Sequence, residues 1–425
     1  MVYLLRNSTE KYMNVIVIGA GISGLIAAYE LERSGINPIL LEASDRVGGR
    51  VATDDVDGFL LDRGFQVLLT AYPEARRYLD FEVLKLKKFY PGALILKPGS
   101  SYTISDPLRN PSEILGMAFS PVGSFMDKLK IYKLTKSLQK KEIDEIFNSP
   151  NISTIQFLKD YGFSEKIITN FFKPFFKGIF LENELKTSAR MFQFVFKMFG
   201  EGFAAVPENG MKAIPEYLKS KLKHTELKLN APVTKIEGHQ VFLENGEVLH
   251  GDKIIIAGKS DHLLPQLKGQ IQPYRSVYNL YFSLEKSFLI RPMIGLIPDN
   301  KFLINNIVFM TDISKAYSKN GKALLSVSVI KPIQNTEKLE NLVAIELEAI
   351  SGIKAEYFKP IKTYEIKEAL PDVEDMKADL PFTNTKIYDH IFLAGDYLLN
   401  GSINAAMTSG RKAVEALLLT TQDPR

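Results

Sequence analysis

Residues Asn14–Arg50 read NVIVIGAGISGLIAAYELERSGINPILLEASDRVGGR, and this stretch decides the fold. It begins with a short apolar run, Asn14–Ile18, of the kind that forms a buried parallel strand. The spacing G-x-G-x-x-G follows, made by Gly19, Gly21 and Gly24. A helical pattern over Leu25–Ser34 then leads to a second apolar strand, Ile39–Leu41. A strand, a glycine turn, a helix and a second strand in this order predict a dinucleotide-binding unit.

The glycines and the start of the helix have separate roles in such a unit. Gly19 permits the tight turn, Gly21 lets the backbone approach a pyrophosphate, and Gly24 lets the helix pack closely on the strand. The helix N-terminus offers unpaired N–H groups and a partial positive charge to phosphates, and Ile22 and Ser23 just before the predicted helix are expected to contact the cofactor. We therefore expect these residues to form a pyrophosphate site.

The residues after the second strand indicate which dinucleotide binds. Glu42 stands where an acid accepts hydrogen bonds from ribose hydroxyls. The run Glu42–Arg50, EASDRVGGR, resembles the E-A-x-x-x-x-G-G-R segment of FAD-binding oxidoreductases in the monoamine oxidase and phytoene desaturase superfamily. Its glycine pair, which includes Gly49, allows a second close backbone approach, and Arg50 adds charge on the pyrophosphate side. The resemblance implies FAD, with Glu42, Ala43, Gly49 and Arg50 among the residues that bind it.

Later segments extend this resemblance over nearly the whole chain. Asp62–Gln66 resembles the family's D-x-G segment, which lines the flavin ring. Ala231–Ile236 resembles the strand that contacts the adenine, Phe392–Asp396 resembles F-x-A-G-[DE], and Ser402–Arg411 resembles the closing helix, whose N-terminus points at the ring. The cofactor contacts implied by these matches are Gly64, Phe65, Gln66, Val233, Gly395, Asp396, Ile403 and Asn404.

Length and composition narrow the function classes. A chain of 425 residues has room for two or three domains, and its net charge of +4 gives no field that would favour nucleic acid. The absence of cysteine excludes disulfides, thiolate metal sites and a cysteinyl-linked flavin, so FAD is expected to be non-covalent. The five histidines show no metal-ligand spacing, and no metal site is predicted. Lacking a signal peptide or an apolar span, the protein is expected in the cytoplasm, with residues 1–12 as a disordered extension.

The predicted elements interleave along the chain. Strand and turn signals occupy the first hundred residues, including a hairpin turn at Asp57–Phe59, and serine-initiated helical patterns follow. These helices are expected at Ser112–Phe119, Ser124–Phe147, Ser153–Tyr161, Ser164–Phe172 and Ser188–Phe199. The fold class is therefore α/β (α+β overall), a Rossmann-like FAD domain of the glutathione-reductase/amine-oxidase type with an interleaved substrate domain. FAD-domain segments are expected at 13–95, 206–270 and 367–425, a helical substrate segment at 96–205 and a mixed-sheet substrate segment at 271–366.

Departures from the amine oxidase pattern bear on the reaction. Asn279 aligns with the strand position where amine oxidases carry a lysine near flavin N5. Ser402 stands where they place one aromatic wall of a cage for the amine. Both departures favour the desaturase branch of the superfamily over the amine oxidases.

Two stretches in the helical segment leave alternatives open. Five phenylalanines lie within Phe171–Phe180, and more follow; they either line a long apolar cavity or form the core of a helical subdomain. Six lysines within Lys128–Lys141 share a helix with Phe125, Leu129, Leu134 and Leu138. That helix either rests on an anionic membrane or presents a solvated lysine face.

We interpret the chain as an FAD-dependent oxidoreductase of the desaturase or oxidase type. It is expected to oxidise C–H bonds of an apolar, isoprenoid- or carotenoid-like substrate by hydride transfer to flavin N5, with oxygen or a quinone as a possible electron acceptor. The alternatives are an amine or protoporphyrinogen oxidase on the same fold, or a flavin-binding protein without turnover. The expected partners are the apolar small molecule and a peripheral membrane contact, and no nucleic acid. The sequence assigns no catalytic residue and no oligomeric state.

Overall fold

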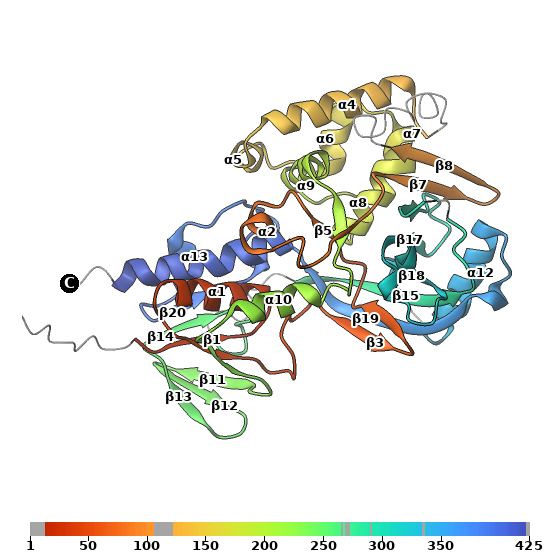
Figure 1. The fold of residues 1–425 in the computed structure, drawn as a ribbon. Coiled ribbons are helices and arrows are strands. Elements are labelled where there is room, and N and C mark those ends of the chain that lie inside the picture. Colours follow the sequence, from red (N-terminus) through yellow and green to blue (C-terminus); the bar gives the residue numbers. More distant parts are fainter. Residues whose placement is uncertain are drawn as a thin grey trace, which may run out of the picture.

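The computed structural model describes residues 13–105, 122–264, 267, 273–289, 291–333 and 336–421. The expected extension at residues 1–12 and the expected helix Ser112–Phe119 lie outside this range. Figure 1 shows three parts: a parallel sheet with its helices, a mixed sheet, and a helical part that lies above both in this view.

The first part is a five-stranded parallel sheet built from three distant stretches of chain. Its order is β10-β2-β1-β14-β20, and every neighbouring pair is parallel. The strands are β1 (Val15–Ile18), β2 (Ile39–Leu41), β10 (Glu226–Lys228), β14 (Lys253–Ile256) and β20 (Ile391–Leu393). Because all of them end at the same edge, the loops that follow β1, β2, β14 and β20 meet there, which is where such sheets bind ligands. The predicted Rossmann-like, interleaved fold class is confirmed.

Helices α1 (Ile22–Arg33) and α13 (Ile403–Thr421) cover this sheet and pack on each other (Figure 1). Their approach depends on glycine. A Cβ on Gly24 would lie 1.8 Å from the Gly19 carbonyl oxygen, and one on Gly410 would lie 2.2 Å from the Ser23 carbonyl oxygen. Helix α1 begins three residues before the predicted Leu25, because Gly21 is its extended N-cap.

The second part is a seven-stranded mixed sheet of order β19-β15-β18-β17-β16-β7-β8. Its strands are β7 (Gly92–Lys97), β8 (Ser100–Ser105), β15 (Tyr274–Leu284), β16 (Ile294–Leu296), β17 (Ile304–Phe309), β18 (Ala323–Val329) and β19 (Lys359–Pro371). Helix α12 (Leu339–Ser351) packs in a hydrophobic cluster with these strands. Two of the expected segment boundaries, 95/96 and 366/367, fall inside β7 and β19. The division of the chain into five segments stays a prediction.

The helical part consists of α4 (Phe125–Lys140), α5 (Ile143–Phe147), α6 (Thr154–Asp160), α7 (Glu165–Ile167), a π-helical turn (Ile168–Phe172), α8 (Lys173–Phe180) and α9 (Ala189–Glu201). The expected serine caps are confirmed: each side chain accepts a backbone N–H of its helix, at Ser124, Ser153, Ser164 and Ser188. The single helix expected over Ser124–Phe147 was wrong. It is broken at Lys141, where the backbone is extended and a new capping box starts α5. The helix expected to end at Phe172 continues through the π-turn into α8.

Smaller elements join these parts. The predicted hairpin turn is confirmed between β3 (Thr53–Val56) and β4 (Phe59–Asp62). One small sheet contains β5 (Leu68–Leu69), β6 (Lys87–Lys88) and β9 (Ala204–Val206); another contains β11 (Val233–Glu237), β12 (Gln240–Leu243) and β13 (Val248–His250). The short helices are α2 (Pro73–Tyr78), α10 (Ala213–Lys221) and α11 (Met310–Ile313).

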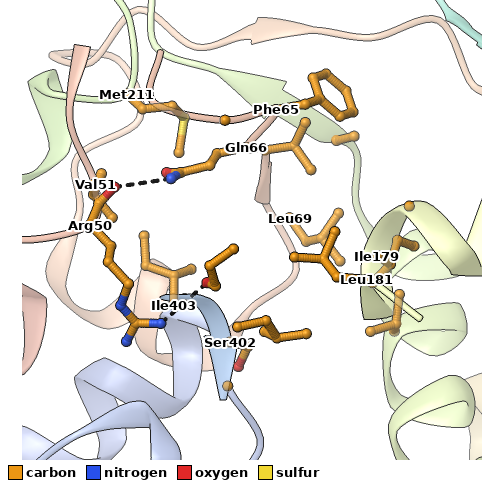
Figure 2. Close-up of a pocket in the computed structure, with 18 of the residues that line it drawn as sticks. Arg50, Val51, Phe65, Gln66, Leu69, Ile179, Leu181, Met211, Ser402 and Ile403 are labelled. Carbon is orange, nitrogen blue, oxygen red and sulfur yellow. Dashed lines mark hydrogen bonds between the residues drawn. The ribbon is translucent and has the colours of Figure 1, made fainter. Parts of the chain in front are cut away.

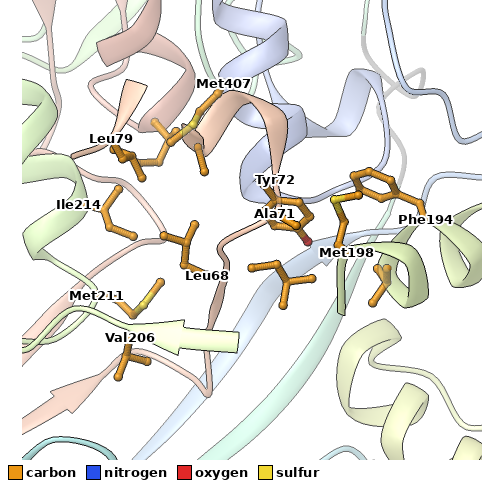
Figure 3. Close-up of a cluster of buried hydrophobic side chains, with 14 of the residues drawn as sticks. Leu68, Ala71, Tyr72, Leu79, Phe194, Met198, Val206, Met211, Ile214 and Met407 are labelled. Atoms are coloured by element: carbon orange, nitrogen blue, oxygen red, sulfur yellow. The ribbon is translucent and has the colours of Figure 1, made fainter. Parts of the chain in front are cut away.

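A continuous hydrophobic cluster links the parallel-sheet part to the helical part (Figure 3). Met407 of α13 lies at one side of this cluster, and Phe194 and Met198 of α9 lie at the other. Tyr72 stacks on Phe194 with 5.7 Å between ring centroids. The two parts therefore share one core.

Two further observations concern membranes and metals. Among the described residues, no helix is long and apolar enough to cross a bilayer.

Three histidines that are far apart in sequence, His239, His250 and His390, come together, with 4.3 Å between the ring centroids of His239 and His390. Even so, the described part of the chain contains no group of side chains that could hold a metal ion.

Candidate functional site

A cavity of about 1300 Å³ runs from the carboxyl edge of the parallel sheet to the helical part. One end is lined by glycines and charged side chains, and the other end by phenylalanines. Figure 2 shows Arg50, Ser402 and Ile403 on one side of it and Ile179 and Leu181 of the helical part on the other.

Backbone from two glycine segments forms the polar end. The Gly48 N–H donates to the Ala20 carbonyl at 2.8 Å, and Gly21 and Gly48 form an isolated parallel bridge. Gly49 has φ +57°, which favours glycine. A Cβ on Gly21 would meet nothing within 4 Å, so the space beside this backbone is open to a ligand. These contacts bring the two predicted glycine segments into one cradle.

Charged side chains surround this cradle. The Arg50 guanidinium pairs with the Asp396 carboxylate, which is 7% exposed. Burial alone would lower the pKa of Arg50, but the charge of Asp396 and the hydrogen bond to it raise that pKa above its ordinary value. Arg50 and Lys259 both lie over the Tyr274 ring, at 5.6 and 5.2 Å from its centroid. Two cations at the end of the parallel sheet suit a pyrophosphate.

Glu42 lies directly after β2, as predicted, and its carboxylate organises the loop around it. It accepts hydrogen bonds from the Ala20 N–H at 2.7 Å and from the Ser44 N–H and hydroxyl at 2.9 and 2.7 Å. The carboxylate also lines the cavity, so a ribose hydroxyl has access to it.

The loop Asp62–Gln66 is fixed from beneath by a buried carboxylate. Asp62 accepts hydrogen bonds from Thr53 Oγ1 at 2.5 Å, the Met211 N–H at 2.9 Å and the Tyr317 hydroxyl at 2.7 Å. Burial raises the pKa of Asp62 above its ordinary value, whereas these three donors act to lower it. The Gln66 amide donates to the Arg50 carbonyl at 3.1 Å (Figure 2). Gly64, Phe65 and Gln66 are thereby held against the cavity.

Helix α13 begins at the cavity, as expected. The Ser402 hydroxyl accepts the Ala405 N–H at 3.0 Å and caps the helix, and Ile403 lines the cavity. Ser402 and Ile403 at this helix end line the same cavity as Gly64–Gln66, and the partial positive charge of a helix N-terminus would stabilise negative charge there. Asn404 has another role, because its side-chain oxygen accepts the Glu74 N–H of α2 at 3.0 Å.

The apolar end resolves the alternative left open for the phenylalanines, because both interpretations hold for different faces. Phe171, Phe175 and Ile179 line the cavity at intervals of one helical turn. Phe172 and Phe176, each 0% exposed, lie in the core instead. Helix α9 divides in the same way: Met191, Val195, Phe196 and Phe199 line the cavity, whereas Phe192 and Phe194 are buried in the core.

The mixed sheet forms the floor of the cavity and carries one polar row. Strand register places Tyr364 beside Asn279, Asn279 beside Ser328, and Ser328 beside Asn306, across β19, β15, β18 and β17. Tyr364, Ser328 and Asn306 line the cavity. Asn279, the residue at the expected lysine position, is fully buried in the same row.

The structure brings most of the predicted cofactor residues to this one cavity. Those that line it are Gly19, Gly21, Ile22, Ser23, Glu42, Gly49, Arg50, Gly64, Phe65, Gln66, Gly395, Asp396 and Ile403. Gly24 acts through helix packing instead, and Ala43, Val233 and Asn404 are not among the lining residues. The assignment of each residue to a part of FAD stays a prediction.

Sequence reasoning missed several lining residues. Arg46 and Lys259 add cations, and Tyr274 supplies an aromatic face. Lys259 carried a usable signal, because it follows the buried strand β14 at the carboxyl edge of the parallel sheet. Tyr274 carried none, since only the crossing of β15 beneath the cradle brings it there.

The residues present fit an FAD molecule. The glycine cradle has open space beside Gly21, cations stand next to it, an acid ends β2, and the cavity continues past the loop Gly64–Gln66. The cradle with its cations suits the pyrophosphate, the acid suits the adenosine ribose, and the space past Gly64–Gln66 suits the flavin ring.

Comparison with known proteins agrees with this geometry. The family model of flavin containing amine oxidoreductases matches residues 22–418. The chain is 28% identical to protoporphyrinogen oxidase 2 of Arabidopsis thaliana over 39% of its length and 32% of the relative's. It is 26% identical to 15-cis-phytoene desaturase of Glycine max over 60% of its length and 48% of the relative's, so the matches span less than half of both relatives. An oxidoreductase from Methanosarcina mazei shares the fold, with a TM-score of 0.73 and 17% identity over 95% of this chain and 100% of that one.

Proposed function

Because this chain belongs to the flavin-containing amine oxidoreductase family and is thus an FAD-dependent oxidoreductase, we propose that it oxidises C–H bonds of an apolar, isoprenoid- or carotenoid-like substrate. The observation that carries the proposal is the apolar end of the cavity. Phe171, Phe175 and Ile179 of the helical part face it, with Phe196 and Phe199 of α9. Such a wall binds hydrocarbon by removing it from water, and it contains no carboxylate to pair with a cation.

Residues at different places along the cavity would have different roles in this reaction. Arg50, Lys259 and the glycine cradle hold the cofactor, which we propose is bound without a covalent link. The loop Gly64–Gln66 and the α13 N-terminus position its ring, and the apolar wall excludes water. FAD, when bound, supplies hydride acceptance at N5. Oxygen or a quinone is proposed as the electron acceptor.

Two positions in the site support the desaturase branch. Asn279 replaces the lysine expected of an amine oxidase, and its amide bonds to Ser326 at 3.2 Å within the sheet. Ser402 caps α13 where an amine oxidase would carry an aromatic cage wall. The similarity to a phytoene desaturase points the same way.

An amine or protoporphyrinogen oxidase is the second candidate. The similarity to a protoporphyrinogen oxidase favours it, and so do Asp54 and Glu365, carboxylates that line the cavity near Tyr364. Asp54 is already engaged, because it accepts hydrogen bonds from Arg63 and Tyr364, and its pKa is lowered to about 2. An ammonium group would therefore compete with an existing cation.

The test is an anaerobic screen of flavin bleaching. The purified protein should be yellow and should release FAD on acid precipitation. Carotenoid precursors should bleach the flavin, while polyamines and porphyrinogens should not. Bleaching by polyamines or porphyrinogens alone would reverse the order of the two candidates. A yellow protein that no compound bleaches would support a flavin-binding protein without turnover, and a colourless protein that cannot be reconstituted would refute the cofactor.

We also propose that helix α4 contacts the surface of an anionic membrane, on its cytoplasmic side. The large side chains Phe125, Met126, Leu129 and Tyr132 are 68%, 56%, 36% and 40% exposed at the start of this helix. Lys133, Lys136 and Lys140 are exposed farther along it. Leu134 and Leu138, which the sequence placed with the apolar stripe, are buried in the protein instead. Tyr132 also lines the cavity, so an apolar substrate could pass from lipid to the site.

Charge reversal tests the membrane contact. Replacing Lys133, Lys136 and Lys140 by glutamate should abolish sedimentation with vesicles that contain phosphatidylserine. The same reversal at the exposed lysines Lys322, Lys354 and Lys359 of the mixed-sheet part is the matched control and should leave sedimentation unchanged. Equal sedimentation of both variants would contradict the contact, and fractionation of cells tests the cytoplasmic location.

A further inference from the structure

On the cavity floor, side-chain hydrogen bonds join Asn279, Ser328 and Asn306 of the polar row to Asn305 and Ser326, and between Asn279 and Ser326 they run in both directions. The Asn305 amide donates to Asn306 Oδ1 at 2.9 Å, and the Asn306 amide donates to Ser328 Oγ at 3.2 Å. Ser328 Oγ donates to Asn279 Oδ1 at 3.3 Å, and the Asn279 amide donates to Ser326 Oγ at 3.2 Å. Each side chain of this chain of bonds is less than 5% exposed.

Burying these polar side chains costs free energy of desolvation, whereas hydrophobic side chains of the same volume would leave no polar group to satisfy. Such a set is therefore a candidate for a function other than stability. The set is also incomplete. Asn305 Oδ1 is buried and accepts no hydrogen bond. An asparagine amide carries two N–H donors and a serine oxygen two acceptor positions. After the side-chain bonds of this set are counted, one N–H each of Asn306 and Asn279 and one acceptor position each of Ser328 and Ser326 remain.

Of these positions, only the N–H of Asn306 and the acceptor position of Ser328 belong to residues that reach the cavity. Ser328 and Asn306 line it, whereas Asn279, Asn305 and Ser326 do not. Gly178 of α8 lies against the same place, where a Cβ would be 3.1 Å from the side chains of both Asn305 and Asn306. The absence of a side chain at position 178 keeps the amides accessible beside the apolar wall.

We propose that Ser328 and Asn306 form a binding subsite for an uncharged hydroxyl group on an otherwise apolar substrate. The hydroxyl oxygen accepts the free Asn306 N–H, and its hydrogen is donated to Ser328 Oγ. The row itself has no formal charge, so it gives an ammonium group no counter-ion. This inference rests on the proposed function, since it specifies the substrate class of the same cavity.

The test compares ligands with one carbon skeleton, measured by their perturbation of the flavin absorption spectrum of the holoenzyme. The probes are geranylgeraniol, the hydrocarbon that lacks its hydroxyl, and the corresponding primary amine. The wild-type protein should bind the alcohol about tenfold more tightly than the hydrocarbon, as expected for two neutral hydrogen bonds. Ser328→Ala and Asn306→Leu should remove this preference and leave binding of the hydrocarbon within about twofold.

Ser326→Ala is the matched control, because Ser326 lies on the same strand and in the same chain of bonds but does not line the cavity. It should keep the tenfold preference. FAD content and thermal midpoint confirm that each variant is folded.

Each other outcome has a separate meaning. Equal binding of alcohol and hydrocarbon by the wild-type protein would overturn the subsite but leave the proposed function intact. Equal loss of preference in all three variants would also overturn it, since the row would then act only through the fold. Tighter binding of the amine would contradict an uncharged ligand. If the protein is yellow and no probe binds, the proposed substrate class itself fails, and the subsite fails with it.

Discussion

Replacing Asp62 by alanine should weaken the fold and the cofactor site together. Asp62 is 1% exposed and ends β4, next to the loop that lines the cavity. Its carboxylate accepts from Thr53, Met211 and Tyr317, and these three residues are themselves 8%, 1% and 0% exposed. Alanine would leave all three donors buried without an acceptor.

The magnitude follows from those donors. Each buried donor that loses its acceptor costs about 1–3 kcal/mol. Removing the buried carboxylate returns part of that cost, because burial already raises the pKa of Asp62 and so disfavours its charged form. The net loss should be about 3–5 kcal/mol. A chain of 425 residues has an unfolding entropy of about 0.9 kcal/mol/K if it unfolds as a unit. The thermal midpoint should therefore fall by about 3–6 °C.

The assay is thermal unfolding of apoprotein and holoprotein, together with the FAD retained after gel filtration. Asp62→Asn keeps the shape of the side chain and one acceptor oxygen, so its free energy of unfolding should fall by less than half as much as that of Asp62→Ala. The control is Asp55→Ala on the same hairpin, where the carboxylate is 44% exposed and pairs with Lys319, and the expected cost is below about 1 kcal/mol. If Asp62→Ala and Asp55→Ala had equal midpoints, the reasoning about Asp62 would be refuted.

Three other predictions separate residues that look alike in sequence. Gly24→Ala should lower the thermal midpoint of the apoprotein, because the new Cβ would lie 1.8 Å from the Gly19 carbonyl oxygen. Gly21→Ala should leave that midpoint unchanged and weaken FAD binding, because its Cβ meets nothing within 4 Å. Equal apoprotein midpoints for the two variants would contradict these assignments. Phe176→Ala, in the core, should lower the free energy of unfolding by about 3–5 kcal/mol. Phe175→Ala, on the cavity wall, should lower it by clearly less. If thermal unfolding gave the reverse order, the assignment of the two side chains to core and wall would be wrong. Burial and, next, the charge of His239 lower the pKa of His390 below its ordinary value of 6.5, so the unfolded chain binds this proton more readily. The resulting penalty is complete below the folded pKa and disappears as the pH rises through about 6.5, so the free energy of unfolding should rise over this window more in the wild type than in His390→Gln. The same substitution at His262, whose side chain is 60% exposed, should preserve the wild-type slope.

The parallel-sheet part of the fold could be predicted because its signals are local. Gly19, Gly21 and Gly24 lie within six residues of one another; Gly19 has φ +99°, and a Cβ on Gly24 would collide with the Gly19 carbonyl oxygen. The serine caps were predictable for the same reason, since each acts within one turn of its own helix. The break at Lys141 was not, because both halves of that stretch have helical periodicity and the capping box of α5 begins with Glu142 rather than serine. Likewise, no local signal shows that β7 joins a sheet whose other central strands come from residues 274–371.

The same distinction explains which site residues were found. Residues predicted to bind the cofactor from contiguous motifs, such as Glu42 and Asp396, do line the cavity. Tyr274 and Ser328 were missed because a strand residue shows its face only once register is known. The phenylalanines of α8 posed a similar difficulty. Apolar residues lie both on its cavity side, as Phe175 and Ile179 do, and on its core side, as Phe176 does. Periodicity alone therefore could not show which side faces the core.

The two ends of the cavity therefore differ in what a substitution can change. The polar end is held by backbone and by paired charges such as Arg50 with Asp396, so we expect most changes there to weaken binding of the proposed cofactor. The apolar end is formed by side chains from α4, α8, α9 and the floor strands, none of which contains a residue of the glycine cradle. A change at Phe175 or Ser328 can alter which molecule fits without disturbing the ring beside Gly64–Gln66. Under the proposed function, substrate choice on this fold can vary while the redox chemistry is retained, because the residues proposed to bind substrate are structurally separate from those proposed to bind the cofactor.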